Sequence, residues 1–298
     1  MNASLKTLLD GYRPQTPADY QAATREIVQE IALLGLWRGA FFEHAAFYGG
    51  TALRIFHGLR RYSEDLDFTL LTGTEALRLE RHLAGVAAEL AAWGFSFEVE
   101  RKSAGDRTGI ESAFLKGGTQ INLLHIGAPS ELARRLPGTQ KIQIKLELDL
   151  RPPPGATTEW RTRLLPSPYQ ARLYDLPSLF AGKLHAVLCR GWKSRVKGRD
   201  FHDFVWYVSR GIRPNLPHLA ARMRQSGHWT GDDPTPSGLR DLLRRRIVTV
   251  DFKRAAEDVV PFLHDPREVE LWSAEFFLNL TEHQLALDEP RENRGSHE

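Results

Sequence analysis

The strongest constraint on the fold is a strict alternation of apolar and polar residues in the segment 142–150. The apolar set is Ile142, Ile144, Leu146, Leu148 and Leu150, and the polar set is Gln143, Lys145, Glu147 and Asp149. Successive side chains of a β-strand point to opposite faces, so this pattern predicts a strand with one core face and one polar face. Asp65–Leu70 alternates in the same way. The first half of the chain must therefore contain a sheet.

Helix signals between these strands predict a mixed α/β domain. Thr16-Pro17 is typical of a helix start, with a capping hydroxyl and a proline at the first helical position. Ala45–Gly50 followed by Thr51–Phe56 indicates a strand, a tight turn and a helix. Thr74 is expected to cap a further helix that ends at Gly94.

Two more features complete the predicted sheet domain. Phe95, Phe97 and Val99 alternate as a strand, and Gly117-Gly118 is expected to form a tight hairpin between two strand segments. The proline-rich stretch that starts at Arg151 then breaks the pattern. We place residues 1–165 in an α/β domain that includes N-terminal helices, and residues 166–298 in a mostly helical domain. Its acidic end, Asp288–Glu298, is expected to be disordered.

Composition excludes several classes of protein. The 298 residues include no apolar run of about 18, so no membrane span is expected, and the N-terminus does not resemble a secretory signal. The one cysteine, Cys189, cannot form an internal disulfide or anchor a cysteine-based zinc site, which fits the reducing cytoplasm. The net charge of +3 is only a weak indication of a polyanionic partner.

Two carboxylates are the first candidate site. Asp65 and Asp67 are two residues apart on a predicted strand, so both leave the same face. Such a pair can hold Mg²⁺ or Mn²⁺, although exposed strands often carry polar residues without a ligand. Glu147 on a neighbouring strand would add a third carboxylate, and Lys145 shares its face. Asp149 also lies on this face, but it is a weaker candidate than Glu147 for the third carboxylate.

A glycine turn is the second candidate. Gly49, Gly50 and Thr51 lie between a predicted strand and a predicted helix, where backbone N–H groups can face a phosphate. Double glycines also mark ordinary turns. Ser63 could bind a phosphate oxygen or only shape the approach to the second strand.

Cations of the second half form the third candidate. Lys183, in an apolar helix, could reach a triphosphate or simply extend its ammonium to water. His185 beside it is more often a packed histidine than a base. Asp200 could cap the next helix, order the basic loop before it or hold Lys183. That loop suits either an RNA backbone or solvent, and its candidate RNA-binding residues are Lys193, Arg195, Lys197 and Arg199.

Together these segments resemble one family. Gly49–Leu53, Arg61–Phe68, Ala181–Ala186 and Lys197–Asp203 look like motifs of the AbiEii/AbiGii (MenT-like) nucleotidyltransferase toxins of bacterial toxin–antitoxin and phage abortive infection systems. The resemblance implies a polymerase-β-like sheet domain followed by a helical domain. It also implies Mg²⁺, an NTP donor, an RNA acceptor (tRNA 3′ ends in some members) and a cognate antitoxin.

The resemblance also implies residue roles. Asp65 and Asp67 match the metal pair, and Ser63 matches a hydroxyl that contacts phosphate and is modified by the antitoxin in some relatives. Lys183 matches a triphosphate-binding lysine, and Asp200 a catalytically needed acid. Glu147 and Lys145 are placed by strand position rather than by motif. Thr51 stands where many transferases have serine, and it keeps the hydroxyl.

The leading hypothesis is therefore a metal-dependent enzyme that transfers a nucleoside monophosphate from an NTP to an RNA hydroxyl. Nucleotidylation of a protein hydroxyl by the same residues is a second hypothesis, in which the basic loop would be dispensable. A non-catalytic module that binds a nucleotide or a partner is a third. It is harder to reconcile with acids retained at 65, 67 and 147.

Overall fold

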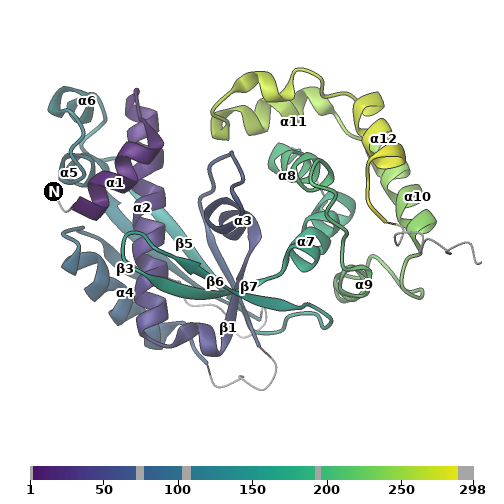
Figure 1. Cartoon of the computed structure of the whole chain (residues 1–298), viewed down its shortest axis with the longest axis horizontal. Helices are drawn as coiled ribbons and strands as arrows, with labels where there is room; N and C mark the ends of the chain where they lie inside the picture. The colour runs from purple at the N-terminus through teal and green to yellow at the C-terminus, as the bar shows by residue number, and fades with distance from the viewer. Residues whose placement is uncertain (1–2, 72–76, 103–108, 192–195, 288–298) are drawn as a thin grey trace, which may run out of the picture. The chain divides into compact units, whose positions relative to one another are not determined.

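The computed structural model describes residues 3–71, 77–102, 109–191 and 196–287 (Figure 1). The chain divides into two compact units. We call residues 1–152 with 157–175 the sheet unit, and residues 153–156 with 176–298 the helical unit. Among the described residues, no helix has both the length and the apolarity that crossing a bilayer requires.

The sheet unit is built on a mixed sheet. Within the described residues it has seven strands in the order β3-β4-β5-β2-β1-β7-β6. The strands are β1 Ala45–Tyr48, β2 Leu66–Leu70, β3 Glu98–Lys102, β4 Ile110–Gly118, β5 Lys141–Asp149, β6 Thr158–Arg163 and β7 Tyr169–Tyr174. The helices are α1 Ala3–Tyr12, α2 Pro17–Arg38, α3 Gly49–His57, α4 Glu80–Ala92, α5 Thr119–His125 and α6 Ser130–Arg134, with a 3-10 turn at Phe41–Glu43.

The two alternating segments occupy the middle of this sheet. β2 pairs in parallel with β5 and antiparallel with β1. Leu66 and Phe68 of β2, like Leu146 and Leu148 of β5, are fully buried. The residues between them in each strand are only partly buried and lie on the opposite face. The predicted division into a core face and a polar face is therefore confirmed.

The long helix α2 forms the centre of the core beneath the sheet. Its start is the predicted one: the Thr16 hydroxyl accepts from the Asp19 backbone N–H, and the Asp19 carboxylate accepts from the Thr16 N–H. Gly35 allows α2 to pack closely on α4, because a Cβ there would lie 3.1 Å from the Val86 Cα. The helix is buried on nearly all sides from Glu26 to Leu36.

The glycine pair at 117–118 does not form the predicted hairpin. Both glycines lie inside β4 and pair with Ile142 and Lys141 of β5. The residues that follow form helix α5 instead of a strand. A Cβ on Gly117 would lie 2.7 Å from the Ser96 carbonyl oxygen, so glycine is required for close packing rather than for a turn. The predicted cap Thr74 lies outside the described residues, and helix α4 begins at Glu80.

The proline-rich segment is followed by two more strands of the same sheet. β6 and β7 pair with each other, and β7 joins β1 in parallel through Phe47 and Leu173. The sheet unit therefore continues to residue 175. Residue 165, where the sequence places the boundary, lies between these two strands.

The helical unit contains helices throughout. They are α7 Leu176–Cys189, α8 Gly198–Val208, α9 Leu216–Gln225, α10 Pro236–Ile247, α11 Phe252–Val259 and α12 Ala274–His283, with 3-10 turns at Val260–Phe262 and Pro266–Val269. Its core is aromatic: Phe252 stacks on Phe277 at 4.4 Å, and Phe180 stacks on Tyr207 at 4.5 Å. The mixed α/β class with a helical C-terminal part is confirmed. The tail 288–298 lies outside the described residues.

Candidate active site

Two of the predicted acids lie side by side on neighbouring strands of the sheet. Asp67 in β2 is the register partner of Tyr48 in β1 and of Glu147 in β5. Register partners on adjacent strands have side chains on the same face, with backbones about 4.8 Å apart. Asp65 immediately precedes β2 and is also partly buried. The sheet thus gathers Asp65, Asp67 and Glu147 in one region of its polar face.

A cavity opens beside Asp65. Its volume is about 320 Å³. Cations and an aromatic ring line it together with the acids, and the full set is Arg25, Glu64, Asp65, Phe114, Lys141, Gln143 and Lys145. The lining residues from β5 are all odd-numbered, on the same side of the strand as Glu147. This composition suits an anionic ligand with a flat ring more than an apolar one.

The glycine turn touches the acids directly. Gly49 has a φ of +82°, and a Cβ on it would lie 2.5 Å from Asp67 Oδ2. A Cβ on Gly50 would lie 2.7 Å from Arg61 Nη2 and 3.0 Å from Ser63 Oγ. No side chain caps the N-terminus of α3, which starts at this turn. The first N–H groups of the helix are therefore placed to donate to a phosphate oxygen beside Asp67.

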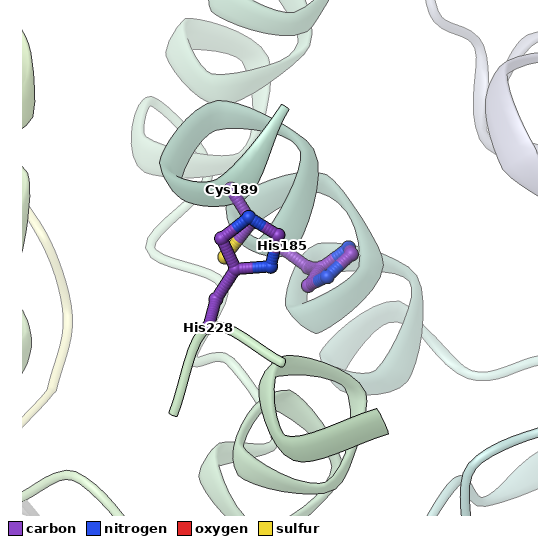
Figure 2. Close-up of side chains that lie close together, drawn as sticks. All are labelled: His185, Cys189 and His228. Carbon is purple, nitrogen blue, oxygen red and sulfur yellow. The ribbon is translucent and has the colours of Figure 1, made fainter. Parts of the chain in front are cut away.

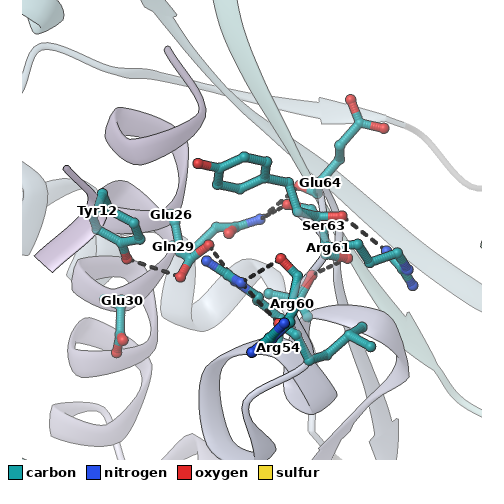
Figure 3. Close-up of polar contacts among 12 residues, drawn as sticks. Tyr12, Glu26, Gln29, Glu30, Arg54, Arg60, Arg61, Ser63 and Glu64 are labelled. Atoms are coloured by element: carbon teal, nitrogen blue, oxygen red, sulfur yellow. Dashed lines mark hydrogen bonds and ion pairs between the residues drawn. The ribbon is translucent and has the colours of Figure 1, made fainter. Parts of the chain in front are cut away.

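The segment between α3 and β2 is held by an extended polar network (Figure 3). Arg54 Nη1 donates to the carbonyl oxygens of Leu59 and Arg60 at 2.8 Å, and Arg54 Nε donates to Glu26 at 2.9 Å. Gln29 Nε2 donates to the Glu64 carbonyl at 2.9 Å. These bonds fix the backbone of the segment that carries Ser63 and Asp65.

Thr51 joins the turn to the same segment. Its hydroxyl donates to the Asp65 carbonyl oxygen at 2.5 Å and lies 2.8 Å from the Ser63 hydroxyl. The Thr51 hydroxyl is thus shared between the Asp65 carbonyl oxygen and the Ser63 Oγ, which both accept from it. The Ser63 hydroxyl therefore lies against the first turn of α3, next to Gly50 and Thr51. Sequence motifs alone did not establish this contact.

The three acids offer the type of ligand that a hard cation prefers, since Mg²⁺ and Mn²⁺ bind carboxylate oxygens. The carboxylate oxygens of Asp65, Asp67 and Glu147 do not all lie within 4.8 Å of one another. A bound cation would therefore have to draw these side chains together. Glu147 Oε1 already lies 2.6 Å from Lys145 Nζ and 3.3 Å from Ser112 Oγ. Lys145 therefore balances part of the negative charge. Asp149 Oδ1 instead accepts from the Arg151 backbone N–H at 2.9 Å, which is a local turn contact.

The candidate residues of the helical unit form a buried ion cluster. Lys183 Nζ lies 2.8 Å from Asp200 Oδ1 and 2.8 Å from Asp203 Oδ2, and Arg190 Nη1 lies 2.6 Å from Asp200 Oδ2. The Asp200 and Asp203 side chains are 4% and 0% exposed. The N-cap of α8 is Lys197, without a side-chain cap, so Asp200 contacts Lys183 and Arg190 rather than capping the helix.

The basic loop is only partly described. Lys193 and Arg195 lie outside the described residues, and Lys197 and Arg199 lie within them. The Arg199 guanidinium lies 4.3 Å from the centre of the Phe262 ring, a cation–π contact that fixes its position.

The family model described as "Nucleotidyl transferase AbiEii toxin, Type IV TA system" matches residues 31–279. The chain belongs to the AbiEii nucleotidyltransferase toxin family. None of the curated proteins matches this AbiEii-family chain in sequence.

Two solved structures from Helicobacter pylori are similar to it. One is described as a candidate nucleotidyltransferase, with 18% identity, a TM-score of 0.50, and coverage of 88% of this chain and 91% of its own. The other, JHP933, has 17% identity, a TM-score of 0.49, and coverage of 88% and 90%. The first of these supports a nucleotidyltransferase fold.

Sequence reasoning missed several residues of the candidate site. Arg61 is 3% exposed and lies against Gly50, yet nothing in the sequence indicated its burial. Lys141 and Gln143 share the face of Glu147, so the alternation itself contained the signal for them. Arg25 comes from the helix α2, and only the tertiary fold brings it to the cavity.

Proposed function

We propose that this AbiEii-family protein transfers a nucleoside monophosphate from an NTP to an RNA hydroxyl in a reaction that depends on Mg²⁺ or Mn²⁺. The 3′ end of tRNA is the acceptor that the family resemblance favours. One observation carries the proposal. Asp67 is in register with Glu147, and its carboxylate lies against the glycine turn that starts α3. Carboxylates and phosphate-binding N–H groups therefore meet in one place.

The proposed reaction is a displacement at phosphorus. The acceptor hydroxyl oxygen loses its proton to solvent and forms a bond to the α-phosphorus of the NTP. The bond between that phosphorus and the oxygen that bridges it to the β-phosphorus breaks, and pyrophosphate leaves. Asp65 and Asp67 would hold the cation, with Glu147 completing the set. When bound, that cation would lower the pKa of the acceptor hydroxyl and neutralise charge on the phosphates.

The chain's own groups would orient the phosphates. The N–H groups of Gly50 and Thr51 at the start of α3, with the Ser63 hydroxyl and the Arg61 guanidinium, would bind phosphate oxygens. We further propose Lys183 as a triphosphate-binding lysine. Its ammonium has three protons and two carboxylate partners, so one proton remains for a phosphate oxygen.

Cations support RNA as the acceptor. Arg25, Lys141 and Lys145 line the cavity beside Asp65, and Phe114 offers a ring on which a base could stack. We propose that Lys193, Arg195, Lys197 and Arg199 of the helical unit contact further phosphates. An NTP-dependent reaction on tRNA would take place in the cytoplasm.

The test incubates the purified protein with each labelled NTP, Mg²⁺ and total tRNA, in parallel with Asp67→Asn and with an EDTA-treated sample. The expected result is label on tRNA from one preferred NTP, lost in the variant and in EDTA. Label on protein instead would favour nucleotidylation of a protein hydroxyl. No transfer to either acceptor, or transfer that survives Asp67→Asn, would contradict the proposal.

The family also implies an antitoxin partner. Expression of the wild-type chain alone is expected to arrest growth, and expression of Asp67→Asn at the same level is not. Equal growth of the two strains, with active enzyme present in the first, would argue for a housekeeping reaction rather than a toxin.

A further inference from the structure

A group of metal-ligating side chains lies in the helical unit, outside the site described above. His185 and Cys189 are one turn apart on α7, and His228 follows α9 (Figure 2). One nitrogen of each imidazole and the Cys189 sulfur all lie within 4.8 Å of one another. We call these three residues the His–Cys cluster. The sequence argument against a zinc site considered cysteine alone, and the fold brings two imidazoles to the same thiol.

Hydrogen bonds prepare both imidazoles for a metal ion. His185 Nε2 and His228 Nδ1 each lie 2.9 Å from the Ser226 hydroxyl oxygen. That hydroxyl donates its one proton to the Met223 carbonyl at 3.1 Å, so it accepts from both rings. Nδ1 of His185 and Nε2 of His228 then carry lone pairs. Metal-binding histidines usually donate their second N–H to such an acceptor.

The donor types select the ion. Two imidazole nitrogens and one sulfur suit Zn²⁺, whereas Mg²⁺ prefers oxygen ligands. We propose that His185, Cys189 and His228 form a zinc site whose fourth position is open to water. Cys189 is 9% exposed, while His228 is exposed at the surface, so an ion can enter from the His228 side.

Zinc binding requires a small contraction of the cluster. Tetrahedral ligands at zinc–nitrogen and zinc–sulfur bond lengths lie about 3.3–3.7 Å apart. His228 belongs to an exposed turn beside Gly227, so its ring can rotate toward α7 without disturbing the core. A bound ion would displace the proton of the Cys189 thiol.

The position of the cluster indicates a structural role. His185 and Lys183 are two residues apart on α7, which places their side chains about 200° apart around the helix axis. The zinc would therefore lie on the opposite side of α7 from the ammonium of Lys183. It would tie α7 to the segment after α9 and stabilise the unit without entering the transfer reaction.

The test uses the full chain, stripped with a chelator and titrated with Co²⁺ and then with competing Zn²⁺. Cys189 is the one cysteine of the chain, so a thiolate-to-cobalt absorption band reports this residue alone. The expected result is one equivalent of ion, the band, its loss when Zn²⁺ is added, and a higher Tm with zinc. Cobalt bound without a thiolate band would overturn the proposal.

Variants give an independent readout. Cys189→Ser should abolish the band, and His185→Ala or His228→Ala should weaken zinc binding by more than about 100-fold. Ser226→Ala should weaken it by about 10–100-fold, as expected for loss of a supporting hydrogen bond. His283→Ala, at an exposed histidine of α12, is the matched control and should bind like wild type. Equal affinity in all five variants would also overturn the proposal.

One further measurement does not depend on whether the variants fold. Zn²⁺ should protect Cys189 of the wild-type protein from alkylation by iodoacetamide, lowering the rate by at least about tenfold. Mg²⁺ at the same concentration should not protect it. Equal alkylation rates with and without Zn²⁺ would show that the thiolate does not bind the ion.

Discussion

Two groups of acidic residues, one in each unit, are placed in opposite ways. In the sheet unit, Asp65, Asp67 and Glu147 are partly exposed on one polar face, and Lys145 is the cation paired with Glu147. In the helical unit, Asp200 and Asp203 are buried and matched by Lys183 and Arg190.

This difference indicates that the first group of acids serves ligand binding and that the second stabilises the fold. Carboxylates crowded on an accessible face repel one another and gain most from an added cation, whereas buried carboxylates need the cations that the protein itself supplies. Substitutions in the first set should therefore lower activity with little loss of stability, whereas substitutions in the second should lower stability, whatever their effect on activity through Lys183. Each of the predictions below tests this distinction.

The largest effect is expected from Asp67→Asn. Transfer should fall by on the order of 100-fold to 1000-fold, the loss typical when a group that stabilises transition-state charge is removed. The free energy of unfolding should stay the same or rise, because repulsion within the acid group is relieved. Both are measured on one preparation, by label transfer and by urea denaturation. If the variant is inactive because it is unfolded, Asp67 stabilises the fold and the distinction between the two groups of acids is wrong.

Asp203→Asn should show the reverse pattern in stability. It leaves Lys183 and Arg190 with one buried carboxylate instead of two, at a cost of about 3 kcal/mol in the free energy of unfolding. Urea denaturation followed by circular dichroism measures it. The matched control is Asp241→Asn, an exposed aspartate paired with Arg244, which should leave stability unchanged. Equal effects of the two substitutions would contradict the distinction.

Two glycines sharpen the comparison further. Gly49→Ala should cost about 1–2 kcal/mol because of its left-handed backbone, and it should lower activity by displacing the Asp67 carboxylate. Gly182→Ala in α7 meets no atom within 4 Å, so it should raise stability by about 0.5–1 kcal/mol. Thermal unfolding and label transfer are measured for both. An active Gly49→Ala would show that the close contact with Asp67 is not needed.

The smallest effect is expected at the cavity. Lys141→Gln should weaken tRNA binding a few-fold and reduce the slope of log affinity against log salt by about 0.7–0.9, the loss of one phosphate contact. Binding is measured by fluorescence anisotropy at several salt concentrations. Lys253→Gln makes the same charge change at an exposed position of α11 and serves as the control. If the slope changes equally in both, the cavity does not bind RNA.

The sequence predicted the core of the site because a strand obeys a simple rule. Alternation in two segments sufficed to place Asp67 and Glu147 on polar faces, and the order of motifs indicated the family. It did not predict β6, whose residues are mostly polar and are either exposed or only partly buried, since an edge strand need not alternate. The roles of the site residues stay predictions until they are tested.

The buried charged residues were not predicted from the sequence, and the reason is different. Glu26 and Glu30 lie on the buried part of α2, where an acid would normally be excluded. They are tolerated because Arg54 and Arg163, distant in sequence, supply the opposite charges. Arg61 is also buried, and its guanidinium donates to the Tyr62 carbonyl oxygen. Such pairings exist only in the folded chain, so no local pattern reveals them.

The parallel pairing of β2 with β5 has a consequence for how the toxin is made. Asp65 and Asp67 are synthesised early, but their partner strand is reached only near Asp149. Contacts between such distant segments form slowly, after the intervening chain has been ordered. A product that stops before β5 would carry the aspartates without the strand that aligns them. Incomplete chains released from the ribosome should therefore be harmless to the cell that makes them.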